Sequence, residues 1–375
     1  MSEKIYTGPA NIITPLGFST DGNFNKLLSG ESAISRHENS WMPHPYFASV
    51  IDEVLLDKAF ADVSADANFT KLEKMMILAL QPAVAQSGSG LNKKTAFILS
   101  TTKGNITALE QHDVEKATLH QLAKTIAGFF KFQSEPIVIS NACVSGIMAM
   151  SVAKRLMQSG MYDDAFVVAG DLVSEFVLSG FNSFQAMSDA PCKPYSKNRT
   201  GVTLGEAAAA VYLTKEKTKA SAEILGDGSI NDANHISGPS RTGEGLFLSV
   251  ESALKEANIS SEKIGFISAH GTATPFNDEM EAIAFNRLSL GQIPLHSLKG
   301  YYGHTLGASG LLEAVIGIEA MNRGKLIASA GFDEIGVSEN INVIAQNADA
   351  DIDYFLKTAS GFGGCNTAVV FGKVI

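Results

Sequence analysis

The sequence predicts an α/β protein built from two fused halves. Strand and helix signals alternate along the chain, with no linker and no low-complexity tract between them. A chain of 375 residues, 45% of them hydrophobic, is long for one core and suits two halves of ordinary domain size. We place the break near residues 214–221 and therefore expect halves at residues 1–216 and 217–375.

Short apolar runs bounded by glycine or polar residues predict the buried strands of each half. In the first half these runs are residues 96–100, 137–139, 165–168 and 207–213. In the second half they are residues 222–225, 264–267, the stretch before Lys299, 354–356 and 367–371. A glycine-rich connection after Lys299 leads into an apolar helix that runs to about Met321.

Charge and composition exclude several classes of protein. The formal net charge of −10 argues against nucleic-acid binding, which relies on clustered lysine and arginine. No apolar run approaches the roughly 18 residues that a membrane helix needs. The three cysteines show no disulfide framework, and the N-terminal residues show no signal-peptide pattern. We therefore expect a soluble protein of the reducing cytoplasm.

Cys143 lies where an apolar strand signal ends and a helical pattern begins. Unpaired N–H groups and the positive end of a helix dipole favour thiolate, which makes this cysteine a candidate nucleophile. Taken alone, such a cysteine is more often a small buried apolar residue. The segment by itself leaves both interpretations open.

Two histidines occupy equivalent turns further along the chain. His270 ends the strand signal of residues 264–267 and precedes a helix that carries Asp278 and Glu281, while Lys299 and His304 lie in the glycine-rich connection. Each histidine alone is more often structural. In parallel α/β sheets, however, such turns meet at one edge of the sheet, where ligands bind. We predict that Cys143, His270 and His304 converge in one pocket.

These segments resemble those of the elongating β-ketoacyl-acyl-carrier-protein synthases, which are condensing enzymes of the thiolase superfamily. The resemblance implies a thiolase-like fold in which two similar α/β halves form an α-β-α-β-α layered architecture. It extends over nearly the whole chain, through residues 11–17, the cysteine turn, 193–201, 204–206, 232–239, the two histidine segments and 359–366.

The resemblance also implies the catalytic residues. Cys143 corresponds to the acyl acceptor, and a cysteine suits this role because its thioester forms readily and is also a tolerable leaving group. His270 and His304 correspond to the two oxyanion donors, and Lys299 to the lysine beside them. From the family we expect Glu281 to pair with Lys299, and Lys299 to orient His304 or lower its pKa.

Further residues are expected to shape the substrate site. The backbone N–H groups of Cys143 and Phe362 would form a second oxyanion hole, with Phe362 as a gate, and glycines would allow the close approach of backbone. The expected set beyond Phe362 comprises Gly361 at the oxyanion hole, Thr272, Thr274, Gly363 and Gly364 for substrate binding, and Met148, Phe181, Phe184 and Met187 along an acyl tunnel.

The implied partner is an acyl carrier protein, whose phosphopantetheine arm carries the substrates, and no separate cofactor or metal ion is expected. Because carrier proteins are acidic, docking calls for a basic patch, for which Lys71, Lys74, Lys197 and Arg199 are the candidates. The family implies a homodimer, and a heterodimer with a homologous chain-length-factor subunit is the alternative assembly.

Several departures from the family pattern bear on function. The chain is shorter than typical elongating synthases, residues 100–104 replace a glycine-rich turn, and Cys365 stands where threonine is usual. We therefore expect a specialised fatty-acid, polyene or polyketide pathway. Two alternatives stay open: a non-catalytic chain-length-factor partner, and a thiolase-like or hydrolytic enzyme that uses coenzyme A thioesters. The intact Cys143 disfavours the first, and the missing second catalytic cysteine disfavours the second.

Overall fold

The computed structural model describes residues 3–66, 68–233 and 238–374. Part of the predicted motif at residues 232–239 lies outside the described residues. The strands are β1 Tyr6–Ile13, β2 Ser35–His37, β3 Tyr46–Ser49, β4 Thr95–Ser100, β5 Ile137–Ile139, β6 Asp164–Asp171, β7 Leu204–Gly205, β8 Ala207–Thr214, β9 Ala222–Asn231, β10 Phe266–Ser268, β11 Leu295–His296, β12 Lys325–Leu326, β13 Ala348–Asp349, β14 Tyr354–Ser360 and β15 Cys365–Gly372.

The α-helices are α1 Thr20–Leu28, α2 Glu53–Ala61, α3 Lys71–Ser87, α4 Val114–Ala117, α5 Leu119–Phe130, α6 Ser145–Gln158, α7 Glu175–Ser183, α8 Glu244–Ala257, α9 Pro275–Arg287, α10 Lys299–Tyr302 and α11 Ser309–Arg323. Strands β4, β5, β6, β8, β9, β10, β11, β14 and β15 lie at the apolar runs that predicted them, and α11 is the predicted apolar helix. These predictions are confirmed, with ends that differ by a few residues.

The ten principal strands follow the order β11-β10-β14-β15-β9-β1-β8-β6-β4-β5. The two halves of this order repeat one pattern. Read outward from the junction, the first half is β1-β8-β6-β4-β5 and the second is β9-β15-β14-β10-β11, and equivalent strands occur in the same order along the chain. In both halves the outer pairs are parallel and the pairs nearest the junction are antiparallel. The chain crosses between the two sets between Thr214 and Ala222.

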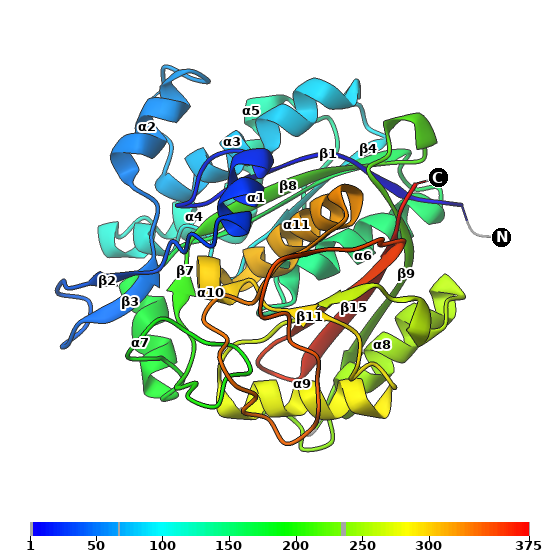
Figure 1. The fold of residues 1–375 in the computed structure, drawn as a ribbon. Helices are drawn as coiled ribbons and strands as arrows, with labels where there is room; N and C mark the ends of the chain where they lie inside the picture. The colour runs from blue at the N-terminus through cyan, green and yellow to red at the C-terminus, as the bar shows by residue number, and fades with distance from the viewer. Residues whose placement is uncertain (1–2, 67, 234–237, 375) are drawn as a thin grey trace.

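The helices repeat as well, and they produce the predicted layers. In each half one helix follows the third strand, α6 after β5 and α11 after β11, and these two helices lie together in the centre of the molecule (Figure 1). Helices α3 and α5 cover the outer face of the first half, and α8 and α9 cover that of the second. The resulting order of layers is α-β-α-β-α.

Alternating side chains along the strands separate the core into layers. On β15, Val369 and Phe371 face the central helices, whereas Ala368 and Val370 face α8 and α9. This alternation is the period of two that a strand imposes. Because apolar side chains point both ways, the strands read as continuous apolar runs in the sequence. In the described residues, no helix is long and apolar enough to cross a lipid bilayer.

Candidate active site

Cys143 occupies a tight elbow between β5 and α6. The residue before it, Ala142, has a φ of 44°, a left-handed conformation that costs a non-glycine residue about 1–2 kcal/mol. Hydrogen bonds from Asn141 N to Ser145 Oγ (2.7 Å) and from Ser145 Oγ to Ala142 O (2.6 Å) hold the turn. The elbow leaves Cys143 only 8% exposed, at the base of a cavity.

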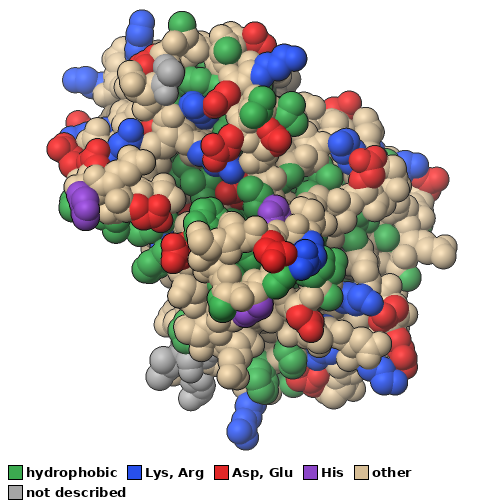
Figure 2. All heavy atoms as spheres, turned by 90° about the vertical axis from the view of Figure 1, so that its left-hand side faces the viewer, with side chains coloured by type: hydrophobic (Ala, Val, Ile, Leu, Met, Phe, Trp, Pro, Cys, Tyr) green, Lys and Arg blue, Asp and Glu red, His purple; other side chains and the backbone are tan. Residues whose placement is uncertain are grey.

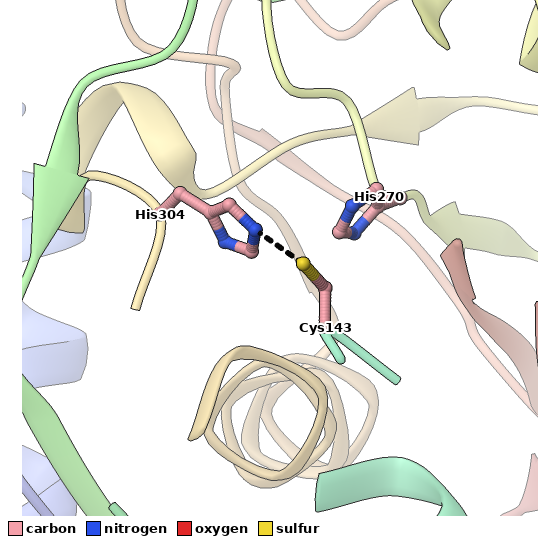
Figure 3. A group of neighbouring side chains, drawn as sticks. All are labelled: Cys143, His270 and His304. Atoms are coloured by element: carbon pink, nitrogen blue, oxygen red, sulfur yellow. Dashed lines mark hydrogen bonds between the residues drawn. The ribbon is translucent and has the colours of Figure 1, made fainter. Parts of the chain in front are cut away.

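The two predicted histidines converge on this thiol. His304 Nε2 lies 3.0 Å from Cys143 Sγ, and the ring of His270 lies 5.3 Å from that of His304 at 84° (Figure 3). All three side chains are buried, and their potential ligand atoms lie within 4.8 Å of one another. This is the convergence that the strand-to-turn positions predicted. A cysteine and two histidines at this spacing also have the chemistry of a zinc site, so the prediction of no metal stays a prediction.

The hydroxyl of Ser309 is compatible with both neutral tautomers of His304. Its hydroxyl lies 3.0 Å from His304 Nδ1 and 3.0 Å from Thr305 Oγ1. A serine hydroxyl can donate or accept, so either ring nitrogen of His304 can carry the proton. Nε2 can therefore accept the proton of the thiol, or it can donate an N–H to an oxyanion.

Burial sets the charge of both reacting groups. It raises the pKa of the Cys143 thiol to about 12, and it lowers the pKa of His304 well below its ordinary value, with help from the charges of Lys299 and Lys357. Desolvation thus opposes the thiolate that the helix start was expected to favour, and the role of Cys143 as nucleophile stays a prediction. Burial thus favours a neutral thiol beside a neutral imidazole over a thiolate–imidazolium pair.

Lys299 does not pair with Glu281 as expected. Its ammonium forms an ion pair with Glu313 of α11 at 2.8 Å and donates to the carbonyl of His270. Glu281 instead accepts the N–H groups of His270 (2.9 Å) and Gly271 (2.7 Å) and the hydroxyl of Tyr195 (3.0 Å). Asn277 Nδ2 donates to the same carboxylate at 3.0 Å, so four donors already occupy Glu281 and leave no place for Lys299. Glu281 thus positions the His270 backbone.

A cavity of about 420 Å³ opens from the thiol to the surface. Thr272, Thr274, Gly361 and Phe362 line it, as do Phe181 and Phe184 among the predicted tunnel residues. Met148 and Met187 pack instead against neighbouring core clusters. Gly363 and Gly364 form the turn beyond the cavity, with φ values of 84° and 85°.

Three aromatic side chains cluster among the residues that line this cavity. Phe362 is 41% exposed, and its ring lies 5.7 Å from that of Phe181 and 5.4 Å from that of Phe184. Gly361, next to it, fits the predicted need for close approach, because a Cβ there would lie 3.1 Å from Cys143 N and 2.8 Å from Cys365 Sγ. Figure 2 shows apolar side chains in the hollowed centre of the face that carries α7.

The four basic residues predicted for docking all have acidic or carbonyl partners within the chain. Lys71 pairs with the buried Glu206 at 2.7 Å, Lys74 with Asp57 at 2.7 Å and Lys197 with Glu334 at 3.1 Å. Arg199 donates to the carbonyls of Ser196, Gly336 and Pro275. Acidic and basic side chains also intermingle on the face in Figure 2. A role for these residues in docking stays a prediction.

Three buried residues of the site escaped sequence reasoning: Glu313, Ser309 and Asp171. Asp171 accepts the N–H groups of Thr102 (3.0 Å) and Gly307 (2.7 Å) and so links the two halves beside Cys143. A useful signal was present for Asp171, because it is a carboxylate at the end of a buried strand. Glu313 offers a similar signal, because it is an acid between the apolar residues of the first half of α11.

Sequence models of one family match most of the chain. The "Beta-ketoacyl synthase, N-terminal domain" matches residues 10–219, and the "Beta-ketoacyl synthase, C-terminal domain" matches residues 221–333. The chain belongs to the β-ketoacyl synthase family. The resemblance seen in the sequence motifs is thereby confirmed.

Curated synthases are similar to the chain at moderate identity. The 3-oxoacyl-[acyl-carrier-protein] synthase 2 of Vibrio harveyi is 33% identical over 259 aligned positions, and the match covers 64% of this chain and 62% of that protein. The enzyme of the same name from Vibrio cholerae is 26% identical over 405 aligned residues, covering 97% of each chain.

Solved ketosynthases share the fold. One is a ketosynthase in complex with its chain length factor from Xenorhabdus doucetiae, with a TM-score of 0.88, 24% identity and coverage of 99% of this chain and 98% of that one. Another is a type II polyketide acyl-carrier protein in complex with its ketosynthase bound to the hexaketide, with a TM-score of 0.89, 20% identity and full coverage of both chains. The predicted thiolase-like fold is confirmed.

Proposed function

We propose that this β-ketoacyl synthase catalyses decarboxylative Claisen condensation between an acyl group on Cys143 and a malonyl-acyl-carrier protein. The observation that carries the proposal is the 3.0 Å contact between Cys143 Sγ and His304 Nε2, with His270 beside them at the base of the cavity. A soft nucleophile, a neutral base and a second imidazole are the groups that both half-reactions need.

In the first half-reaction Cys143 takes the acyl group from its carrier. The sulfur forms a bond to the acyl carbon as its proton passes to His304 Nε2, and that proton then reaches the departing phosphopantetheine thiolate. Proton transfer to a positioned base typically contributes 10²–10⁴ in rate. The backbone N–H groups of Cys143 and Phe362 would hold the tetrahedral oxyanion.

In the second half-reaction the malonyl thioester loses carbon dioxide. The electron pair of the breaking C–C bond forms an enolate, whose oxygen would accept N–H groups from His270 and His304. The enolate carbon then attacks the Cys143 thioester, the Cys143 sulfur departs as thiolate, and it takes a proton from solvent. The product is a β-ketoacyl-carrier protein.

The partner and pathway belong to the same proposal. We expect an acyl carrier protein as the substrate carrier, and a homodimer or a heterodimer with a chain-length-factor subunit. Two structural neighbours support this, since one is a ketosynthase in complex with its chain length factor and the other a carrier protein in complex with its ketosynthase. The short chain and the unusual turn at residues 100–104 support a specialised pathway. The chain-length-factor alternative for this chain itself has less support, because Cys143 sits in contact with a histidine.

The first experiment offers the purified protein an acyl-carrier and a malonyl-carrier, and follows both intact mass and product. We expect the wild type to gain one acyl group and to release a β-ketoacyl-carrier. Cys143→Ala should lose acylation, and His304→Ala should lose the product. A wild type that takes up no acyl group from chains of any length, alone or with a homologous partner, would contradict the proposal.

A further inference from the structure

A second buried lysine lies behind the active site and has no part in the steps above. Lys357, on β14, is fully buried. Its ammonium donates to the carbonyls of Thr358 (2.6 Å), Ser268 (3.1 Å) and Ala269 (3.5 Å), and it forms an ion pair with Glu313 Oε2 at 2.6 Å. A buried charge of this kind costs several kcal/mol unless it is well paired.

The partners of Lys357 determine its protonation. Carbonyl and carboxylate oxygens can only accept hydrogen bonds, so the Lys357 nitrogen meets acceptors alone, which suit the three N–H donors of an ammonium better than the two of an amine. A neutral amine would direct its lone pair at an acceptor. Burial does lower the pKa of Lys357, yet this arrangement of acceptors requires the ammonium.

Glu313 joins this lysine to Lys299. One carboxylate oxygen contacts Lys299 at 2.8 Å and the other contacts Lys357 at 2.6 Å. Because Lys299 also donates to the carbonyl of His270, two ammonium groups hold three successive carbonyls, those of residues 268–270. Glu281 holds the N–H of His270 from the other side. The backbone that carries His270 is therefore fixed by charged groups on both sides.

We infer that Lys357 is a positioning residue for the condensing reaction, which holds the strand end that carries His270 and, with Lys299, keeps His304 neutral by its charge. This inference rests on the proposed function. The charged or titratable groups around Lys357 are Lys299, Glu313, Glu281 and the buried His296. Removing the Lys357 charge leaves Lys299 as the cation paired with Glu313 and weakens the potential that disfavours a protonated His304.

Two variants and one control test the inference. Lys357→Gln keeps N–H donors for the carbonyls and removes the charge, and Lys357→Met removes both. The control is Lys154→Met. Lys154 is also buried, but it pairs with Asp227 (3.0 Å) and Glu256 (2.6 Å) and contacts none of the residues that hold His270. The readouts are carbon dioxide release from malonyl-carrier, acylation of Cys143 by intact mass across pH, and thermal unfolding.

We expect Lys357→Met to release carbon dioxide about 10- to 100-fold more slowly. One oxyanion donor typically contributes a factor of about 10²–10³ to the rate, and a misplaced His270 would lose part of that factor. Acylation at pH 8 should stay within about threefold of wild type. In Lys357→Gln the acylation rate should start to fall at a higher pH than in the wild type, because His304 is more easily protonated without the Lys357 charge. Lys154→Met should lower the unfolding temperature without separating the two activities.

Two results would overturn the inference about Lys357. If both activities fall in parallel with stability in the Lys357 variants, as in Lys154→Met, then Lys357 is only structural. If neither activity nor pH profile changes, the inference is also overturned. A wild type that neither takes up an acyl group nor releases carbon dioxide would instead overturn the proposed function, so the two failures are told apart by the wild-type measurement.

Discussion

At the scale of single residues, the ionisation of Cys143 departs from what a helix start suggests. Because burial raises the pKa of this thiol to about 12, the reactive thiolate is scarce at neutral pH and increases with every unit of pH. We predict that alkylation of Cys143 by iodoacetamide rises about tenfold per pH unit from pH 6 to 10, measured by peptide mass. A rate independent of pH in this range would mean a resting thiolate–imidazolium pair.

Ser309 gives the second residue-scale prediction. Its hydroxyl lets His304 exchange between accepting and donating at Nε2, so Ser309→Ala should slow Cys143 acylation at least tenfold, part of the usual contribution of a positioned base. The control is Ser151→Ala, which removes another buried serine hydroxyl, one that donates to the carbonyl of Ile147 within α6. Equal acylation rates in the two variants would show that Ser309 does not orient the imidazole.

At the scale of elements, the crossing of α6 and α11 brings Cys143 to His304. Glycines make this approach possible: a Cβ on Gly310 would lie 2.9 Å from Ile147 Cβ, and one on Gly146 would lie 2.6 Å from the carbonyl of Gly307. Gly310→Ala should therefore push the helices apart and reduce kcat by about 10²-fold, the cost of roughly 1 Å of misplacement.

Gly128 provides the matched control for this substitution. It lies in α5, and a Cβ there meets nothing within 4 Å. Gly128→Ala should leave kcat unchanged and raise stability by up to about 1 kcal/mol, because alanine favours a helix over glycine. Condensation rates and urea unfolding measure both variants, and a Gly310→Ala enzyme with wild-type kcat would refute this role for the helix crossing.

At the scale of the whole molecule, buried histidines link folding stability to pH. Burial lowers the pKa of His296 to about 4, whereas an unfolded histidine titrates near 6.5. Between these values the unfolded chain binds the extra proton, so stability falls as the pH drops. From pH 7 to 5 this residue should contribute about 2 kcal/mol of lost unfolding free energy.

Urea unfolding at the two pH values checks this prediction with two variants. Between pH 7 and 5, the unfolding free energy of His296→Asn should fall by about 2 kcal/mol less than that of the wild type. His120→Asn, which changes an exposed histidine on α5, should keep the wild-type difference. Identical pH dependence in all three proteins would mean that folding does not lower the pKa of His296.

The sequence by itself determined nine of the strands and the family, and it singled out the candidate reacting groups. Apolar runs and turn residues are local, so they located nine of the strands and put Cys143, His270 and His304 directly after strand signals. Motif order then pointed to the β-ketoacyl synthase family. These features depend on neighbours along the chain, which the sequence displays directly.

Only the tertiary structure decided which charges meet. Lys299 pairs with Glu313 rather than Glu281, Lys357 joins them from β14, and Lys71 turns inward to Glu206. The pKa of Cys143 likewise follows from burial. These outcomes depend on distances and desolvation between segments far apart in the chain, and no local pattern encodes them.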